Sequence, residues 1–159
     1  MTDKARHYLE QAVMLAHRNA QAGGRPFGAV VVRGGEVLAT GVNETVATHD
    51  PTAHAELVAL RAAALQLGSP DLAGCAVYAS GHPCPMCLAA MRLAGVERVV
   101  YAHSNEDGAP YGLSNASIYE EMKNPFADLP MSIRHRPVAE EGVAPLYAEW
   151  HGRRSAGKA

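Results

Sequence analysis

The chain has 159 residues, of which 48% are hydrophobic and 19% are charged. This composition is typical of one folded domain and argues against disorder. Fourteen Lys and Arg residues against sixteen Asp and Glu residues give a formal net charge of −2. A long nucleic-acid footprint needs a basic excess, so we do not expect a nucleic acid as the partner. The small basic group near the end, Arg153, Arg154 and Lys158, is interpreted as a solvated tail.

The sequence contains no apolar run of the roughly 18 residues that a membrane span needs, so we expect no membrane partner. The N-terminal residues MTDKARHYLEQ lack the apolar core of a signal peptide, which predicts a cytoplasmic protein. In that reducing compartment the three cysteines, Cys75, Cys84 and Cys87, cannot form a disulfide framework. A close pair of cysteines then favours metal binding or redox chemistry.

The first predicted elements are a helix and a β-hairpin. Apolar side chains at helical spacing predict a helix over 3–21, which a pair of glycines ends. The β-rich runs 27–33 and 36–42 follow, and they are separated by Gly34 and Gly35. Two strands joined by two glycines predict a hairpin.

A second helix is predicted after the polar loop 43–49. Asp50 suits the N-cap and Pro51 the first helical position, so we expect this helix to run to about Leu67. The remaining predicted elements are a strand at 75–80, a helix from Pro85 to Gly95, a strand at 96–102, a loop at 103–117, a short helix at 115–122, a strand at 131–136 and a final helix at 145–155.

The order of these elements predicts the fold class. Strands that alternate with helices indicate an α/β fold, a layered domain with a mixed sheet. The sequence shows no internal repeat and no linker, so residues 1–159 are predicted to form a single domain.

Two short motifs carry the chemistry. The segment THDPTAHAE contains His54 and Glu56, and the segment GHPCPMC contains Cys84 and Cys87. Zinc binds histidine nitrogen and thiolate sulfur in a tetrahedron, and a catalytic site keeps one position open for water. One histidine and two cysteines leave that position open. His54, Cys84 and Cys87 are therefore the predicted zinc ligands, and the start of a helix after the cysteine turn favours thiolates.

Glu56 follows His54 by two residues and can lie beside the metal without binding it. At that place it can take a proton from water and give it to a ring nitrogen or a leaving amine. Glu56 is therefore the predicted catalytic residue. The combination H-x-E with P-C-x-x-C is the pattern of zinc deaminases that act on nucleobases.

Other interpretations of these residues exist. A Cys-x-x-Cys pair can be a redox site, although His54 and Glu56 would then have no explanation. A structural zinc would need a fourth protein ligand, for which Cys75, His82 or His49 could serve. Cys75 opens a predicted strand and is interpreted as a core residue, because a free cysteine packs as a small hydrophobe.

The sequence resembles the cytidine/deoxycytidylate deaminase superfamily over roughly 25–125. The resemblance extends beyond the metal motifs to RPFGAVVV, GVN, HDPTAHAE, PCPMC and SIYEE. Within the superfamily the chain is most similar to the bacterial guanine deaminases, which share the PFGAV, DPTAHAE and PCPMC segments and a short helix with Ile-Tyr. The tRNA adenosine deaminases share HDPTAHAE and a similar cysteine motif, but they carry more positive charge.

The resemblance implies a three-layer α-β-α fold with a five-stranded mixed sheet, and a homodimer. It implies zinc on His54, Cys84 and Cys87, with Glu56 as the proton shuttle. It also implies that the segment 145–159 can swap onto a partner subunit. The substrate-binding candidates are Asn43 for hydrogen bonds to the base, His82 through its backbone carbonyl, and Phe27, Gly28, Ala29, Ala55 and Asn115 around the ring.

Three departures from the family pattern concern the substrate. His82 stands where glutamate is usual, Asn115 stands where guanine deaminases have an acidic residue, and their terminal tyrosine has no equivalent. The expected reaction is the conversion of guanine to xanthine and ammonia. The alternatives are deamination of another aminopurine, a pterin, a triazine or a cytosine-like base, tRNA adenosine deamination, and a zinc-stabilised module without activity. An intact Glu56 argues against the last of these.

Overall fold

The computed structural model describes residues 3–138, 142–143 and 145–156. The chain divides into two compact units, Met1–Asn124 and Pro125–Ala159. Each unit is described by itself. No helix among the described residues combines the length and the apolar character that crossing a bilayer demands.

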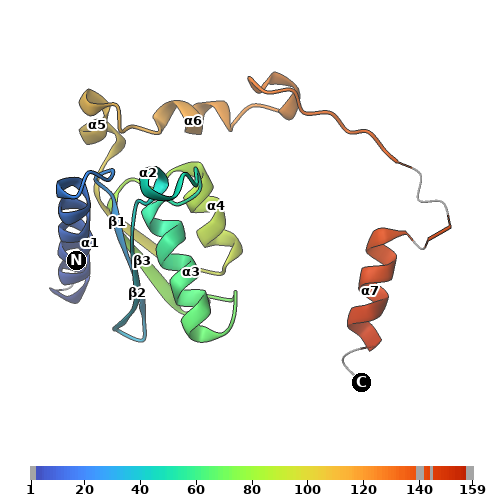
Figure 1. The fold of residues 1–159 in the computed structure, drawn as a ribbon, viewed down its shortest axis with the longest axis horizontal. Helices are drawn as coiled ribbons and strands as arrows, with labels where there is room; N and C mark the ends of the chain where they lie inside the picture. Colours follow the sequence, from blue (N-terminus) through green and yellow to red (C-terminus); the bar gives the residue numbers. More distant parts are fainter. Residues whose placement is uncertain (1–2, 139–141, 144, 157–159) are drawn as a thin grey trace. The chain divides into compact units, whose positions relative to one another are not determined.

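The first unit contains the sheet and the helices that pack on it (Figure 1). Its longer elements are, in chain order, α1 (Asp3–Gln21), β1 (Gly28–Arg33), β2 (Glu36–Val42), α3 (Ala55–Leu67), β3 (Cys75–Gly81), α4 (Pro85–Leu93) and β4 (Arg98–His103). Its shorter elements are α2 (Thr45–Thr48), α5 (Asn105–Gly108), η1 (Ala109–Tyr111) and α6 (Ala116–Glu121).

The sheet is mixed, with the strand order β2-β1-β3-β4. The centre strand β1 pairs antiparallel with both β2 and β3. β3 and β4 are parallel, because α4 carries the chain back between them. The layered α/β fold with a mixed sheet is therefore confirmed.

Each face of the sheet is covered by helices. Successive side chains of a strand point to opposite faces, and β1 shows this alternation clearly. Ala29 and Val31 join the core cluster on the side of α3 and α4. Val30 and Val32 join the cluster with Tyr8 of α1. The sheet thus lies between α1 on one face and α3 with α4 on the other (Figure 1).

A glycine allows one helix to approach the sheet closely. A Cβ atom at Gly41 of β2 would lie 2.4 Å from the carbonyl oxygen of Ala55 and 2.6 Å from the amide nitrogen of Ala59. Real Cβ atoms essentially never come so close, so only glycine fits there. The absence of a side chain at this point lets the first turn of α3 lie directly against the end of β2.

The predicted fifth strand at 131–136, in the second unit, is wrong. Residues 131–136 have no regular secondary structure, so the described residues form four strands and not five. Met131 and Ile133 alternate with polar residues as in a strand, yet both are exposed. A strand needs a hydrogen-bonded neighbour, and the described part of this unit contains only η2 (Phe126–Asp128) and α7 (Leu146–Ala156).

The predicted final helix is confirmed as α7. Arg153 and Arg154 lie in its last turn and are exposed, as the interpretation of a solvated tail requires. Lys158, which was assigned to the same tail, lies outside the described residues.

Candidate active site

The start of α3 differs from the prediction. Asp50 does not cap the helix, because its Oδ1 accepts hydrogen bonds from the amide and the hydroxyl of Thr52, at 2.7 and 2.6 Å. An aspartate that bonds the backbone two residues ahead forms a turn of its own. The helix therefore begins at Ala55, and His54 takes the N-cap position with an extended backbone.

The start of α4 agrees with the prediction. Cys84 is the N-cap and Pro85 the first residue of the helix, which places Cys87 in its first turn. A proline at the first helical position costs no hydrogen bond there. The free amides of a first turn attract negative charge, so this turn favours both cysteines as thiolates.

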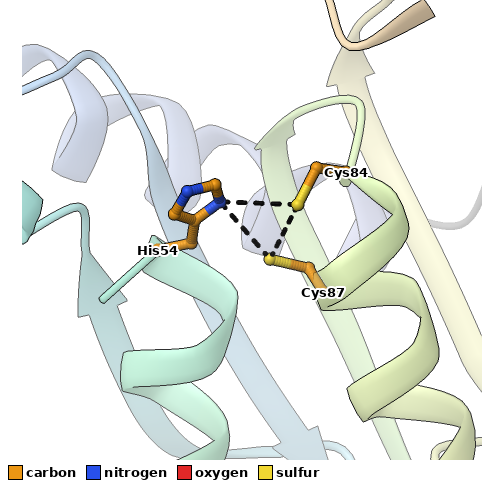
Figure 2. Close-up of side chains that lie close together, drawn as sticks. All are labelled: His54, Cys84 and Cys87. Carbon is orange, nitrogen blue, oxygen red and sulfur yellow. Dashed lines mark hydrogen bonds between the residues drawn. The ribbon is translucent and has the colours of Figure 1, made fainter. Parts of the chain in front are cut away.

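The predicted zinc ligands meet between these two helix starts. The Nδ1 atom of His54 lies 3.5 Å from Cys84 Sγ and 3.6 Å from Cys87 Sγ, and the two sulfur atoms are 3.5 Å apart. Figure 2 shows the three side chains converging, the histidine from the start of α3 and the cysteines from the start of α4. They form a group whose ligand atoms all lie within 4.8 Å of one another.

These distances fit a zinc ion. Zn–S bonds of about 2.3 Å and Zn–N bonds of about 2.0 Å in a tetrahedron give distances of roughly 3.5–3.8 Å between ligand atoms. The three observed distances agree with that range. Among the described residues the group has only three members, and Cys75 is buried in the hydrophobic core as predicted. Three protein ligands leave one coordination position for water or substrate.

Glu56 lies against this group without being part of it. It is the second residue of α3 and is buried, and its Oε2 is 3.5 Å from Cys87 Sγ. Burial raises the pKa of the Glu56 carboxyl, because a charged carboxylate loses hydration inside the protein. A carboxyl that accepts a proton readily is suited to general acid–base chemistry.

The two cysteines differ in the pKa of their thiols. The hydrogen bond between the two sulfur atoms, with a further bond to His54, lowers the pKa of Cys84 to about 4. The same hydrogen bond, together with burial, raises the pKa of Cys87. The hydrogen bond with Cys84 also raises the pKa of His54. One thiolate is therefore already favoured at this place, as a cation site requires.

A cavity of about 220 Å³ opens onto His54, Glu56 and Cys84. Four of the predicted substrate-binding residues also line it, namely Phe27, Asn43, His82 and Asn115. The other three predicted residues, Gly28, Ala29 and Ala55, are buried in the protein and are not among the residues that line it. The cavity wall is completed by Arg25, Gly112, Leu113 and Ser114, which the sequence interpretation did not include.

Asn43 has one side-chain atom already engaged. Its Oδ1 accepts hydrogen bonds from the hydroxyl of Thr45 at 2.7 Å and from the amide of Thr45 at 3.2 Å. Asn43 is buried, and no buried side-chain nitrogen or oxygen atom of the described residues lacks a partner. Its amide nitrogen has no hydrogen bond to the described protein, so it is accessible to the contents of the cavity. Asn43 thus offers the cavity a donor.

The short helix α6 is fixed to the cysteine turn. The hydroxyl of Tyr119 donates a hydrogen bond of 2.6 Å to the carbonyl oxygen of Pro83, next to Cys84. Burial raises the pKa of Tyr119, which keeps this hydroxyl protonated. The segment that carries Asn115 is therefore held beside the zinc ligands.

Comparisons with known proteins agree with this geometry. Residues 2–103 match the cytidine and deoxycytidylate deaminase zinc-binding region. The chain is 40% identical over 141 residues to guanine deaminase of Bacillus subtilis, a match that covers 88% of this chain and 82% of that protein. The solved structure of a guanine deaminase from Bacillus subtilis superimposes with a TM-score of 0.83 at 35% identity, over 98% of this chain and 95% of that one.

Two further relatives show the range of the family. A tRNA-specific adenosine deaminase of Aquifex aeolicus is 35% identical over 96 residues, which cover 60% of this chain and 64% of that protein. A structure solved in complex with 2,6-diaminopurine has a TM-score of 0.65 at 31% identity, over 68% of this chain and 61% of that one. The match to more than half of the chain, together with the His54, Cys84 and Cys87 group, shows that the protein belongs to the cytidine and deoxycytidylate deaminase family and is a zinc-dependent deaminase.

Proposed function

We propose that the protein hydrolyses the amino group of a free nucleobase, with guanine as the substrate and xanthine and ammonia as the products. The observation that carries this proposal is the similarity to guanine deaminase of Bacillus subtilis, which extends over nearly the whole chain in sequence and in structure. The related structure that holds 2,6-diaminopurine supports a purine as the ring.

The cavity supports a small substrate. Its volume of about 220 Å³ lies below the roughly 300–1,000 Å³ of pockets for drug-sized ligands, which suits one small heterocycle. The aromatic ring of Phe27 offers a flat apolar contact, and Asn43 offers a donor to the polar edge of the base. The formal net charge of −2 gives no support to a tRNA substrate.

The reaction breaks the exocyclic carbon–nitrogen bond to the amino group and forms a carbon–oxygen bond at the same ring carbon. Zinc on the three ligands would supply a Lewis acid that activates water for this attack. Glu56 takes the proton that the attacking water loses and delivers it to the ring nitrogen next to the reacting carbon. Glu56 then carries the second proton to the amino group, which leaves as ammonia. This role is supported by the position of Glu56, which lies beside Cys87 and lines the cavity.

An ammonia-release assay over a panel of rings tests the proposed function. The zinc-loaded protein is given guanine, 2,6-diaminopurine, adenine, a pterin, a triazine and cytosine, and Glu56→Gln serves as the blank. We expect ammonia and xanthine from guanine. Release from a different ring and not from guanine would replace the proposed substrate. Release from none of the rings, with inosine formed in a tRNA transcript, would replace the substrate class.

We also propose that the protein acts as a homodimer, as the family resemblance implies. The exposed aromatic residues of α7 support an interface there, because Tyr147 is 85% exposed and Trp150 is 56% exposed. Sedimentation of the wild type and of a Tyr147→Ser, Trp150→Ser variant measures the mass. A dimer that this pair of substitutions weakens is the expected result, and a wild-type monomer at all concentrations would contradict it.

A further inference from the structure

Asn105 joins two walls of the cavity through one side-chain amide. Its Oδ1 accepts a hydrogen bond of 2.9 Å from the backbone N–H of Asn115. Its Nδ2 lies 2.5 Å from Nδ1 of His82. His82 and Asn115 both line the cavity that contains the candidate active site. Asn105 does not line that cavity; together with His82 it lines a neighbouring cavity of about 230 Å³. The amide therefore connects the end of β3 with the segment that precedes α6.

The chemistry of these groups determines the direction of both hydrogen bonds. A backbone N–H can only donate, so the atom of Asn105 that faces Asn115 is the amide oxygen. The atom that faces His82 is then the amide nitrogen, which also can only donate. His82 must accept this bond at Nδ1. An imidazole with an unprotonated Nδ1 carries its proton on Nε2.

The ring of His82 is also held in place by aromatic contacts. It makes an edge contact with Tyr101, with ring centres 4.7 Å apart, and a tilted contact with Tyr119 at 5.3 Å. Its Nε2 has no hydrogen bond to the described protein. Because no buried side-chain nitrogen of the described residues lacks a partner, Nε2 is accessible from outside the protein interior. The one polar atom of the ring that stays available is thus a donor.

We propose that Asn105 is a positioning residue that fixes His82 with its proton on Nε2, so that His82 presents an N–H donor to the bound ring. The inference rests on the proposed function and refines its substrate class. It selects a heterocycle that presents an acceptor at this wall, either a carbonyl oxygen or an unprotonated ring nitrogen. His82 therefore contributes its side chain to recognition, in addition to the backbone carbonyl expected from the family resemblance.

The position of the proton can be measured directly by NMR. Long-range proton–nitrogen correlation on the ¹⁵N-labelled, zinc-loaded protein separates protonated from unprotonated imidazole nitrogens, and His82→Phe assigns the His82 signals. We expect an unprotonated Nδ1 and a protonated Nε2. In Asn105→Asp the side chain has only acceptors, so the proton should move to Nδ1. A protonated Nδ1 in the wild type, or no change in Asn105→Asp, would overturn the proposal.

A double-mutant cycle separates positioning through His82 from a general structural role. Asn105→Ala should raise KM for the best ring of the panel about fivefold, the scale of one hydrogen bond, with kcat within about twofold. In a His82→Phe background, which keeps an aromatic ring between the tyrosines, Asn105→Ala should change KM by less than about twofold. An equal effect in both backgrounds would overturn the proposal. Asn124→Ala, which changes an exposed asparagine, is the matched control and should leave KM unchanged.

The two claims fail in different ways. A wild-type protein that deaminates no ring of the panel contradicts the proposed function, while the NMR measurement still decides the role of Asn105. A wild type that deaminates guanine but has a protonated Nδ1 at His82 contradicts only the positioning role.

Discussion

The carboxylate of Glu56 lies against a cysteine of the zinc-ligand group, with its Oε2 atom 3.5 Å from Cys87 Sγ. Both residues are buried, and each belongs to the first turn of its helix. The two helix starts thus bring a buried carboxyl and the metal-ligand group within contact distance. This relationship places the two short motifs in one candidate site.

Glu56→Gln should keep the fold and the zinc and lose turnover. The amide has nearly the same shape but cannot carry the proton, so kcat should fall at least about 100-fold. The control Glu36→Gln changes an exposed glutamate of β2 and should leave kcat unaltered. Steady-state ammonia release and metal analysis give both values. Near-normal turnover with Gln at position 56 would mean that another group carries the proton.

Cys87→Ser should lose zinc and stability together. Removing one of three protein ligands weakens binding, and a protein with zinc at about 100 times its Kd gains about 3 kcal/mol from that binding. In thermal unfolding at saturating zinc, Cys87→Ser should therefore be less stable than the wild type. The control Cys75→Ala removes a core sulfur away from the site and should keep one zinc per chain, at a cost of about 1 kcal/mol. Full zinc occupancy in Cys87→Ser would exclude Cys87 as a ligand.

Asn115→Asp should improve the use of guanine relative to the other rings. Asn115 is half-buried and lines the cavity. A carboxylate only accepts hydrogen bonds, which suits the N–H donors of guanine, and its charge strengthens each bond. We expect kcat/KM for guanine to rise about fivefold relative to the best other ring. If Asn115→Asp leaves this ratio as it is in the wild type, residue 115 does not determine which base is preferred.

The Asp50 turn should contribute stability that depends on pH. Hydrogen bonds from the Thr52 side chain and backbone, with the charge of Arg61, hold the pKa of Asp50 below its ordinary value of 3.8. Because the folded pKa is the lower one, the contribution is present above the unfolded pKa and is lost as pH falls through the folded pKa. Carbon NMR of the carboxyl should show a midpoint below 3.8.

Thr52→Val provides the matching variant for the Asp50 turn. It removes the hydroxyl donor and should move the Asp50 midpoint upward. The part of the difference in unfolding free energy that comes from the Asp50 charge should disappear at a pH below both midpoints. A midpoint that does not move would show that the hydroxyl of Thr52 does not lower the pKa of Asp50.

Local signals in the sequence predicted most of the fold correctly. The hairpin of β1 and β2 follows from alternating residues around a glycine pair, and both features act within a few residues. The predicted start of α3 was wrong because Asp50 can either cap a helix or accept a hydrogen bond from Thr52 in a turn. The sequence does not distinguish these two roles. The strand at 131–136 was wrong because alternation alone supplies no neighbouring strand.

In the candidate site, too, the local features were predicted and the long-range contacts were missed. The cysteine turn is local, since Cys84 and Cys87 lie in one helical turn, and the ligand preference of zinc joined it to His54. Arg25, which lines the cavity, and Asn105, which contacts His82, were missed because these positions depend on distant segments that meet in space. Asn105 contacts His82, which is 23 positions away, and no local sequence pattern around either residue predicts this contact.

The most direct test of the central claim is a zinc titration of the metal-free protein with guanine as the substrate. Ammonia release is measured against the amount of zinc added per chain. The geometry of His54, Cys84 and Cys87 predicts no release without zinc and a linear rise that saturates at about one zinc per chain, at a plateau that Glu56→Gln does not reach. Full activity in the metal-free protein, or a rise with zinc that Glu56→Gln matches, would contradict this account.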